Sequence, residues 1–358
     1  MLGEAGVATI LVDRSTFPRD KPCGEGLMPA GVEVLEGLGI ALDSFPALTG
    51  VTYRVPGAGS AAGHFAKGRT GRAVRRVRFD QMLAERASAT PHVDARFGCA
   101  VEAIKVGRDG IGALTSSGTL HARYVVGADG LRSRVARWMG WSREPRRRRY
   151  ALVGHAPAPA HGLDRVTVTV LDGSEVYAAP TGPDELLVAV LGGKRGLRAG
   201  GESARAAYRR MVTTAHPEAQ IAADHPVRGA GPFWVRPSRV AGQGVFLLGD
   251  AAGFLDPLTG DGMSDGLVAA QQLARIMAAG EPAPERAYRR WEAGQWRRRV
   301  FVNRLALTLT GSSVLARRAL RRLQQRPATL NRLLEINDGS QSLWSLSWRD
   351  WSALAGIR

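Results

Sequence analysis

Residues 245–267, VFLLGDAAGFLDPLTGDGMSDGL, carry the clearest fold signal in the chain. The apolar first residues predict a buried strand that ends at Gly249-Asp250, and a helix is expected to begin near Met263. The loop between them is rich in glycine, which lets a backbone approach a ligand closely. The helix start offers unpaired N–H groups and a positive dipole end, and a strand-end carboxylate accepts hydrogen bonds from ribose hydroxyls. These features suit a ligand with a sugar, a pyrophosphate and a ring that becomes anionic.

A second segment of the same kind lies earlier, at residues 124–137, YVVGADGLRSRVAR. A buried strand leads through Asp129 and Gly130 into a helix that has Ser133 near its start. Alone, this pattern is an ordinary strand–turn–helix with an Asx turn and an N-cap. Together with residues 245–267, it indicates a doubly wound α/β sheet.

The N-terminal stretch MLGEAGVATILVDRS predicts the end of a helix followed directly by a strand. Gly6 caps the helix, and residues 7–12 are apolar and β-branched up to Asp13. A helix that leads into a parallel strand normally follows a partner strand. We therefore expect a further strand upstream of Met1.

The rest of the chain divides into regions of different composition. Residues 99–127 predict a meander of strands attached to the doubly wound sheet, and residues 51–77 predict short strands. Residues 151–240 hold short alternating strands and one helix, which predicts an antiparallel sheet. The predicted divisions are an α/β domain at 1–150 that continues at 241–285, a substrate domain at 151–240, and an arginine-rich helical region at 286–358.

Composition excludes several classes of protein. The 358 residues carry a formal net charge of +17, but 45 of the 49 basic residues are arginine, which reflects base composition as much as a charged partner. No zinc spacing, recognition helix or RNA-binding aromatic motif is present, so we expect no nucleic-acid partner. The histidines show no metal-ligand spacing, and Cys23 and Cys99 make no secreted disulfide framework. Without a visible signal peptide or an apolar run of membrane-span length, a cytoplasmic protein is expected.

In this order and at this separation, the segments resemble the fingerprints of the flavoprotein hydroxylase superfamily, which includes para-hydroxybenzoate hydroxylase and geranylgeranyl reductase. VVGADGLRSRVAR is similar to the second fingerprint, and VFLLGDAAGFLDPLTGDGMSDGL is similar to the third. ILVDRSTFPRDKPCGEGLMPAG resembles the reductase-like branch, in which Lys-x-Cys-Gly follows the second strand. The resemblance implies an α/β fold: a Rossmann-like FAD-binding domain with its first strand missing, an antiparallel substrate sheet and C-terminal helices.

The resemblance implies FAD as the cofactor and gives individual residues a place around it. Asp13 would bind the adenosine ribose where most relatives have glutamate, with Arg14 beside the adenine. Asp129 and Gly130 would lie near the pyrophosphate. Arg76 would match a basic residue that approaches the flavin side of the cofactor.

The third fingerprint implies the largest set of cofactor contacts. Asp250, after Gly249, would bind the ribityl or pyrophosphate region of FAD. The residues implied to pass along the isoalloxazine ring are Pro257, Gly260, Asp261, Gly262 and Met263. The helix start there would stabilise negative charge on the reduced flavin. Cys23 lies in the loop that runs near the ring in the reductase-like branch, and a plain loop residue is an equal interpretation.

Members of the superfamily begin with a strand, a Gly-x-Gly-x-x-Gly motif, a helix and a second strand that ends in an acid about 20 residues beyond the motif. Asp13 is only the thirteenth residue. The resemblance therefore places that motif upstream of Met1, and the form that starts at Met1 is expected to bind FAD poorly.

The resemblance implies an FAD-dependent oxidoreductase, with NAD(P)H as electron donor and a hydrophobic small molecule as substrate. The favoured reaction is monooxygenation, the hydroxylation of an aromatic or polyketide-like substrate in an apolar pocket. The alternative is reduction of a C=C bond in an isoprenoid or quinone-like lipid. Geranylgeranyl reductases carry Tyr-x-Trp-x-Phe-Pro on the substrate sheet. The matching EVYAAPTG keeps only Tyr177 and Pro180, which favours hydroxylation, and no halogenase Gly-Trp-x-Trp-x-Ile-Pro motif is present.

A second alternative is a basic protein that retains the fold without turnover and binds a membrane surface. The arginine-rich helices at 286–325 and the tail LWSLSWRDW suggest this peripheral membrane contact. Packing of the same helices against the FAD-binding domain is the simpler interpretation.

Overall fold

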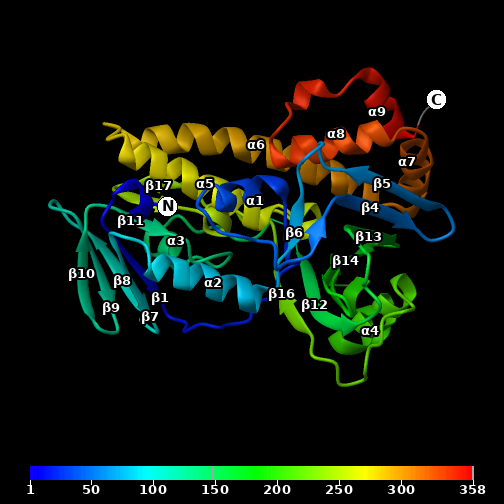
Figure 1. Ribbon diagram of the computed structural model, residues 1–358, viewed down its shortest axis with the longest axis horizontal. Coiled ribbons are helices and arrows are strands. Elements are labelled where there is room, and N and C mark those ends of the chain that lie inside the picture. Colours follow the sequence, from blue (N-terminus) through cyan, green and yellow to red (C-terminus); the bar gives the residue numbers. More distant parts are fainter. Residues whose placement is uncertain (147, 195, 357–358) are drawn as a thin grey trace.

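The computed structural model describes residues 1–146, 148–194 and 196–356, and these form a mixed α/β structure with five β-sheets (Figure 1). The helices are α1 (Pro29–Glu36), α2 (Arg76–Ser88), α3 (Arg134–Trp138), α4 (Ala204–Ala215), α5 (Gly262–Ala278), α6 (Pro284–Thr310), α7 (Ser313–Gln325), α8 (Pro327–Asp338) and α9 (Trp348–Ala355). Short 3₁₀ turns are η1 (Gly3–Ala5), η2 (Gly196–Gly201), η3 (Gly249–Ala251), η4 (Pro257–Thr259) and η5 (Leu343–Ser345).

The first eleven strands are β1 (Thr9–Asp13), β2 (Gly26–Leu27), β3 (Ala47–Leu48), β4 (Gly50–Val55), β5 (Gly59–His64), β6 (Gly71–Ala73), β7 (Val93–Phe97), β8 (Val101–Val106), β9 (Ile111–Thr115), β10 (Gly118–Ala122) and β11 (Val125–Gly127). The remaining strands are β12 (Arg149–Pro157), β13 (Arg165–Leu171), β14 (Ser174–Gly182), β15 (Glu185–Gly193), β16 (Arg228–Ala230), β17 (Ala241–Gly242) and β18 (Val245–Leu247).

Two parallel strand pairs form the part of the fold that the glycine-rich segments predict. β1 pairs with β7, and β11 pairs with β18. All three residues of β18 are fully buried, as expected for a strand covered on both faces. β8, β9 and β10 form the predicted antiparallel meander beside these pairs. The predicted α/β fold class is therefore confirmed.

The two parallel pairs belong to separate sheets. In the described ranges β1 pairs only with β7, and its Ile10 and Leu11 are 42% and 37% exposed. Apolar strands of a parallel sheet are normally buried on both faces. Gly6 caps η1 at φ 76°, as the sequence indicates. The upstream strand and its glycine motif stay predictions.

A seven-stranded sheet forms the other half of the molecule, with the strand order β16-β12-β15-β14-β13-β4-β5. Its pairs are antiparallel except for β13 with β4. β4 and β5 come from residues 50–64, so a hairpin from the first part of the chain extends the predicted substrate sheet. The domain boundaries predicted at residues 150, 240 and 285 stay predictions.

Helices cover both faces of this sheet. On one face, Tyr208 and Met211 of α4 pack against Val176 and Val188. On the other face lie the C-terminal helices, and α6 runs across the top of the view from the meander side towards them (Figure 1). The space between this second face and α6, α7 and α8 becomes important below.

One predicted element is wrong after residue 73. The stretch RAVRRVRF, residues 72–79, was expected to be a strand, but only β6 at its start is extended and α2 begins at Arg76. Arg76 forms an ion pair with Asp80 one turn later, at 2.8 Å, and its backbone N–H donates to the Glu25 carboxylate at 2.8 Å. Glu25 is distant in sequence, so this helix start could not be found from local propensity.

The C-terminal region is helical, as predicted. None of the helices in the described part of the chain is both long enough and apolar enough to cross a membrane. Asp350 joins α9 to α8: it makes a capping box with Ser347, accepts from Thr329 Oγ1 at 2.7 Å and pairs with Arg332. Burial alone would raise the pKa of Asp350, but the hydrogen bonds from Ser347 and Thr329 outweigh it and lower the pKa to about 2.

Asp350→Asn should lower the free energy of unfolding by about 1–2 kcal/mol at pH 7, because a helix cap and a charged acceptor are weakened. The pKa in the folded state lies below the unfolded value of about 3.9. The stabilisation is therefore present above about pH 4 and is lost as the pH falls towards 2. Urea unfolding at several pH values measures it, and a constant difference between the two proteins down to pH 2 would contradict this assignment.

Candidate functional site

The strand end at Asp250 meets the start of α5. Gly249 has φ 57°, a left-handed conformation that favours glycine, and a Cβ on it would stand 3.7 Å from Cα of Gly266 in α5. This close approach turns the chain so that the Asp250 carboxylate lies 3.7 Å from the Cβ position of Gly262. The strand end and the start of α5 are therefore neighbours, and the roles of Gly249, Asp250 and Gly262 towards FAD stay predictions.

The N-terminus of α5 has no side-chain cap. Asp261 occupies the N-cap position, but its Oδ1 accepts from Thr259 Oγ1 at 3.0 Å and makes no cap hydrogen bond. Gly260 before it has φ 68° and ends η4. The first N–H groups of α5 and the positive end of its dipole therefore remain available to an acceptor-rich ligand.

Positive side chains from three parts of the chain act on Asp250. Burial raises the pKa of its carboxyl group, and the charges of Lys21, Arg299 and Arg76 oppose that rise. Lys21 also lies against the second glycine segment, with its Nζ 3.6 Å from the Cβ position of Gly130. Lys21 stands in the N-terminal segment ILVDRSTFPRDKPCGEGLMPAG. It therefore links that segment to both glycine-rich segments, at Gly130 and at Asp250, although no cofactor role was predicted for it.

The loop that carries Cys23 joins the same group. The Cys23 sulfur accepts from the backbone N–H of Glu25 at 3.4 Å, and it is close enough to the Arg76 guanidinium to act on its pKa. Burial would lower the pKa of Arg76, but the charge of Cys23 and hydrogen bonds to Asp80 raise it, so Arg76 stays cationic. Cys23 therefore lies beside a fixed positive charge.

Glu25 and His155 form a buried pair that sequence reasoning missed. Glu25 has φ 55°, which is rare outside glycine, and is 1% exposed. Its carboxylate lies 2.8 Å from His155 Nε2 on β12, and Arg75 stands 3.7 Å from it. These contacts fix the Cys23 loop to the seven-stranded sheet. Their only sequence signal was a glutamate between two glycines.

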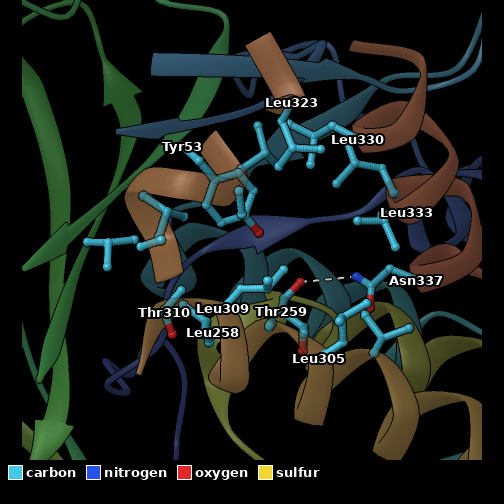
Figure 2. Close-up of a pocket in the computed structure, with 18 of the residues that line it drawn as sticks. Tyr53, Leu258, Thr259, Leu305, Leu309, Thr310, Leu323, Leu330, Leu333 and Asn337 are labelled. Atoms are coloured by element: carbon cyan, nitrogen blue, oxygen red, sulfur yellow. Dashed lines mark hydrogen bonds between the residues drawn. The ribbon is translucent and has the colours of Figure 1, made fainter. Parts of the chain in front are cut away.

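A cavity of about 100 Å³ lies between the seven-stranded sheet and helices α6, α7 and α8 (Figure 2). Most of its wall is aliphatic, for example Leu258 of η4, Leu323 of α7 and Leu330 of α8. An engineered cavity of about 150 Å³ with such a lining binds benzene, so this one holds a small apolar group without rearrangement. One end is formed by η4 and Met28, next to the start of α5.

Few polar groups reach this cavity, and two lack partners. Tyr177 is 4% exposed, and its hydroxyl has no hydrogen-bond partner in the described chain. Burial, with the nearby charges of Cys23 and Glu25, raises the pKa of Tyr177, so it stays neutral. Asn337 donates to Thr259 O at 3.1 Å, but its own Oδ1 is unpartnered among the described residues (Figure 2).

A buried ion network holds η4 in place beside the cavity. Arg149 donates to Asp256, the N-cap of η4, at 2.7 Å and to Glu175 of β14 at 2.5 Å. Thr310 of α6 donates to Glu175 at 2.6 Å, and Asn303 donates to Asp256 O at 2.8 Å. From sequence alone, the arginine run at 146–149 is expected to be a solvated face or a linker. Arg147 lies outside the described residues, and for Arg149 that interpretation is wrong.

The remaining predicted cofactor residues have local contacts. Asp13 lies at the end of β1 as predicted, and its Oδ1 accepts from Ser15 N at 2.8 Å, whereas Arg14 is exposed. The Asp129 carboxylate accepts from Arg134 N at 2.6 Å and from Val135 N at 3.2 Å at the start of α3. Among the described residues no hydrogen bond or ion pair joins these side chains to Asp250, and their roles towards FAD stay predictions.

The site suits a ligand with anionic and ribose groups, because the start of α5 is uncapped, Gly249 is closely packed and positive side chains converge on Asp250. FAD fits this description. This fold and site define an FAD-dependent flavoprotein oxidoreductase. Residues 1–287 match the FAD binding domain family, and the chain belongs to it.

Sequence relatives include two kinds of reductase. The chain is 29% identical over 304 residues to the menaquinone reductase of Mycobacterium tuberculosis, which covers 76% of this chain and 71% of that protein. It is 30% identical over 176 residues to the digeranylgeranylglycerophospholipid reductase of Methanothrix thermoacetophila, covering 46% of this chain and 44% of that one.

Solved structures share the fold at lower identity. A flavoprotein/dehydrogenase from Cytophaga hutchinsonii superposes with a TM-score of 0.81 at 18% identity, covering 96% of this chain and 89% of that one. PqsL from Pseudomonas aeruginosa, a probable FAD-dependent monooxygenase, superposes with a TM-score of 0.71 at 22% identity, covering 92% and 94%. Likeness at this level supports the architecture alone.

Proposed function

We propose that the protein is an FAD-dependent reductase of a C=C bond in an isoprenoid or quinone-like lipid. The cavity beside the start of α5 carries the proposal, because its wall is aliphatic and holds almost no groups that could orient a polar aromatic substrate. The similarity to menaquinone reductase supports the same substrate class. Hydroxylation, which the sequence favours, stays the competing prediction.

The departure from the geranylgeranyl reductase pattern is consistent with this proposal. Tyr177, which EVYAAPTG retains, is the residue of that motif that lines the cavity. Counted from Tyr177, the positions where Trp and Phe are absent hold the smaller residues Ala179 and Thr181 of β14. A substrate chain wider than the present cavity would still require its walls to move.

A side chain of the protein is placed to donate the proton that the reduction requires. When bound and reduced, the flavin would supply the electron pair for the double bond, as a hydride. The other carbon of that bond would need a proton, and we assign its donation to Tyr177, which lines the cavity and whose hydroxyl has no hydrogen-bond partner in the described chain. The aliphatic wall excludes water, so the proton has to come from a side chain. NAD(P)H is the proposed electron donor to FAD.

One experiment separates the two reactions. The flavin of the purified protein is reduced without oxygen, and menaquinone or an electron-rich aromatic compound is then added. Under the proposal, menaquinone gains two hydrogen atoms without oxygen, and mass spectrometry still finds them after the quinone ring is reoxidised in air, because they are on carbon and not on the quinone oxygens. Product that contains one added oxygen atom, formed only after O₂ is admitted, would instead establish hydroxylation and overturn the proposal.

Cys23→Ala should change the flavin absorption spectrum or the turnover rate without changing folding, if the loop that carries Cys23 beside Arg76 runs along the flavin ring. Cys99→Ala is the matched control, since Cys99 is buried in the meander region beside Ser116 and Ser117. Visible spectroscopy and steady-state turnover measure the effect. Identical spectra and rates in wild type and Cys23→Ala would leave Cys23 as a loop residue without chemical role.

A further inference from the structure

Three tryptophan side chains in the C-terminal region are exposed to solvent. Trp344 in η5 is 94% exposed, Trp348 at the start of α9 is 71% exposed, and Trp351 is 42% exposed. Tryptophan is highly buried on average in soluble proteins, so three exposed ones within eight residues require an explanation. We call Trp344, Trp348 and Trp351 the tryptophan ridge.

The ridge is held in place by its neighbours. Trp351 packs edge-on against Phe301 of α6, with ring centroids 5.8 Å apart. Arg349 lies over the Trp348 ring at 5.5 Å from its centroid. The capping box at Ser347 and Asp350 fixes the start of α9 between them. The indole groups are therefore presented by ordered structure.

Positive charge adjoins the ridge on α7. Arg317, Arg318 and Arg321 are exposed on this helix. The end of α9 touches it, since a Cβ on Gly356 would lie 2.7 Å from Cβ of Arg318. Exposed indoles and exposed guanidinium groups therefore lie on α9 and α7, two helices that are in contact, so this part of the surface carries both apolar and cationic groups.

Nearby acidic residues do not cancel this charge. Residues 311–356 hold seven arginines and three acidic residues. Asp350 is buried and bonds to Thr329 and Arg332, and Asp338 pairs with Arg69 at 2.5 Å. The exposed charge of the α7–α9 surface is therefore positive.

We propose that the tryptophan ridge and the arginines of α7 bind the anionic surface of a lipid bilayer. Indole groups prefer the boundary between lipid and water, and arginine near that surface is attracted to anionic headgroups. Charge complementarity therefore favours an anionic membrane. The inward faces of α7 and α8 line the apolar cavity, for example with Leu323 and Leu330, so the contact surface is on the helices that enclose it (Figure 2).

This contact is peripheral, and it is independent of which reaction the flavin performs. A lipid substrate would reach helices α7 and α8 from the bilayer without passing through water. A protein that hydroxylates a water-soluble compound could carry the same surface. Membrane binding and catalysis are therefore tested by separate measurements.

Vesicle co-sedimentation tests the membrane contact directly. The full 358-residue chain is mixed with phosphatidylcholine vesicles, with or without phosphatidylglycerol. We expect binding to the vesicles that contain phosphatidylglycerol, a blue shift of tryptophan emission, and weaker binding at higher salt. Wild type that stays in the supernatant with phosphatidylglycerol vesicles would overturn the proposal.

Two pairs of variants locate the surface. Trp344→Ala/Trp348→Ala and Arg317→Glu/Arg318→Glu should each lower the partition coefficient about tenfold or more. Because these side chains are exposed, the variants should keep the circular dichroism spectrum of wild type. Arg108→Glu/Arg123→Glu is the matched charge control on the meander, where both arginines are exposed, and should bind more strongly than the α7 pair.

The same protein samples, measured without vesicles, test whether a second copy of the chain covers this surface instead of a membrane. Sedimentation velocity would show self-association that Trp344→Ala/Trp348→Ala abolishes if a second copy of the chain covers the ridge. That result, or equal vesicle binding by the ridge variant and wild type, would overturn the membrane assignment.

Discussion

Replacing Arg149 with methionine should lower the free energy of unfolding by about 3–5 kcal/mol. The change leaves Glu175 and Asp256 buried without their counterion, and an uncompensated buried charge carries a cost of this size. Burial already raises the pKa of Glu175 with Arg149 present, so the carboxyl group is poorly solvated. Urea unfolding measures the loss, and η4 beside the cofactor site should lose its fixed position.

Arg148→Met is the matched control, because the adjacent arginine is exposed. It should change stability by less than about 0.5 kcal/mol. A triple variant, Arg149→Met with Glu175→Gln and Asp256→Asn, should recover part of the loss, since no charge is left unpaired. If Arg149→Met and Arg148→Met are equally stable, the buried network does not support the fold.

Replacing Asp250 with alanine should weaken FAD binding about tenfold or more. The carboxylate lies at the uncapped start of α5 and is the acceptor assigned to the ribityl or pyrophosphate region. Loss of a charged hydrogen bond costs about 1.5–3 kcal/mol, which corresponds to that change in Kd. Titration of the protein with FAD, followed by flavin fluorescence, measures it.

Asp250→Asn should have a smaller effect, because the amide keeps an acceptor oxygen without the charge. Asp109→Ala, on an exposed turn of the meander, should leave FAD affinity unchanged. Unchanged affinity in Asp250→Ala would remove residues 249–263 from the cofactor site. The FAD affinity of the unsubstituted 358-residue chain is the reference for these comparisons. Its measurement also tests the expectation that this chain binds FAD poorly.

Local sequence patterns predicted the parts of the fold that local interactions determine. The strand–glycine–helix run at 245–267 and the strand–turn–helix at 124–137 are set by glycine, proline and cap residues within a few positions. Ser133 caps α3 by accepting from Ala136 N at 2.9 Å, as its position in the sequence suggests. Three strands of the seven-stranded sheet, β13, β14 and β15, were visible through their alternation.

Contacts between distant residues could not be predicted in the same way. Arg149, Glu175 and Asp256 are 26 to 107 positions apart, and Arg149 stands in a run of arginines in which Arg146 and Arg148 are exposed. His155 shows no pattern in the sequence because its partner Glu25 is 130 residues away. Only the fold brings these groups into one low-dielectric region, where they determine the geometry of the site.

The one-sided pairing of β1 has a consequence for handling the protein. The strand presents a row of backbone donors and acceptors next to the exposed Ile10 and Leu11, which is the kind of surface on which another chain can add as a further strand. A concentrated preparation should therefore scatter light, and Ile10→Lys should suppress the scattering because a charged edge resists strand addition. Turbidity therefore measures whether the free edge of β1 is covered by another segment.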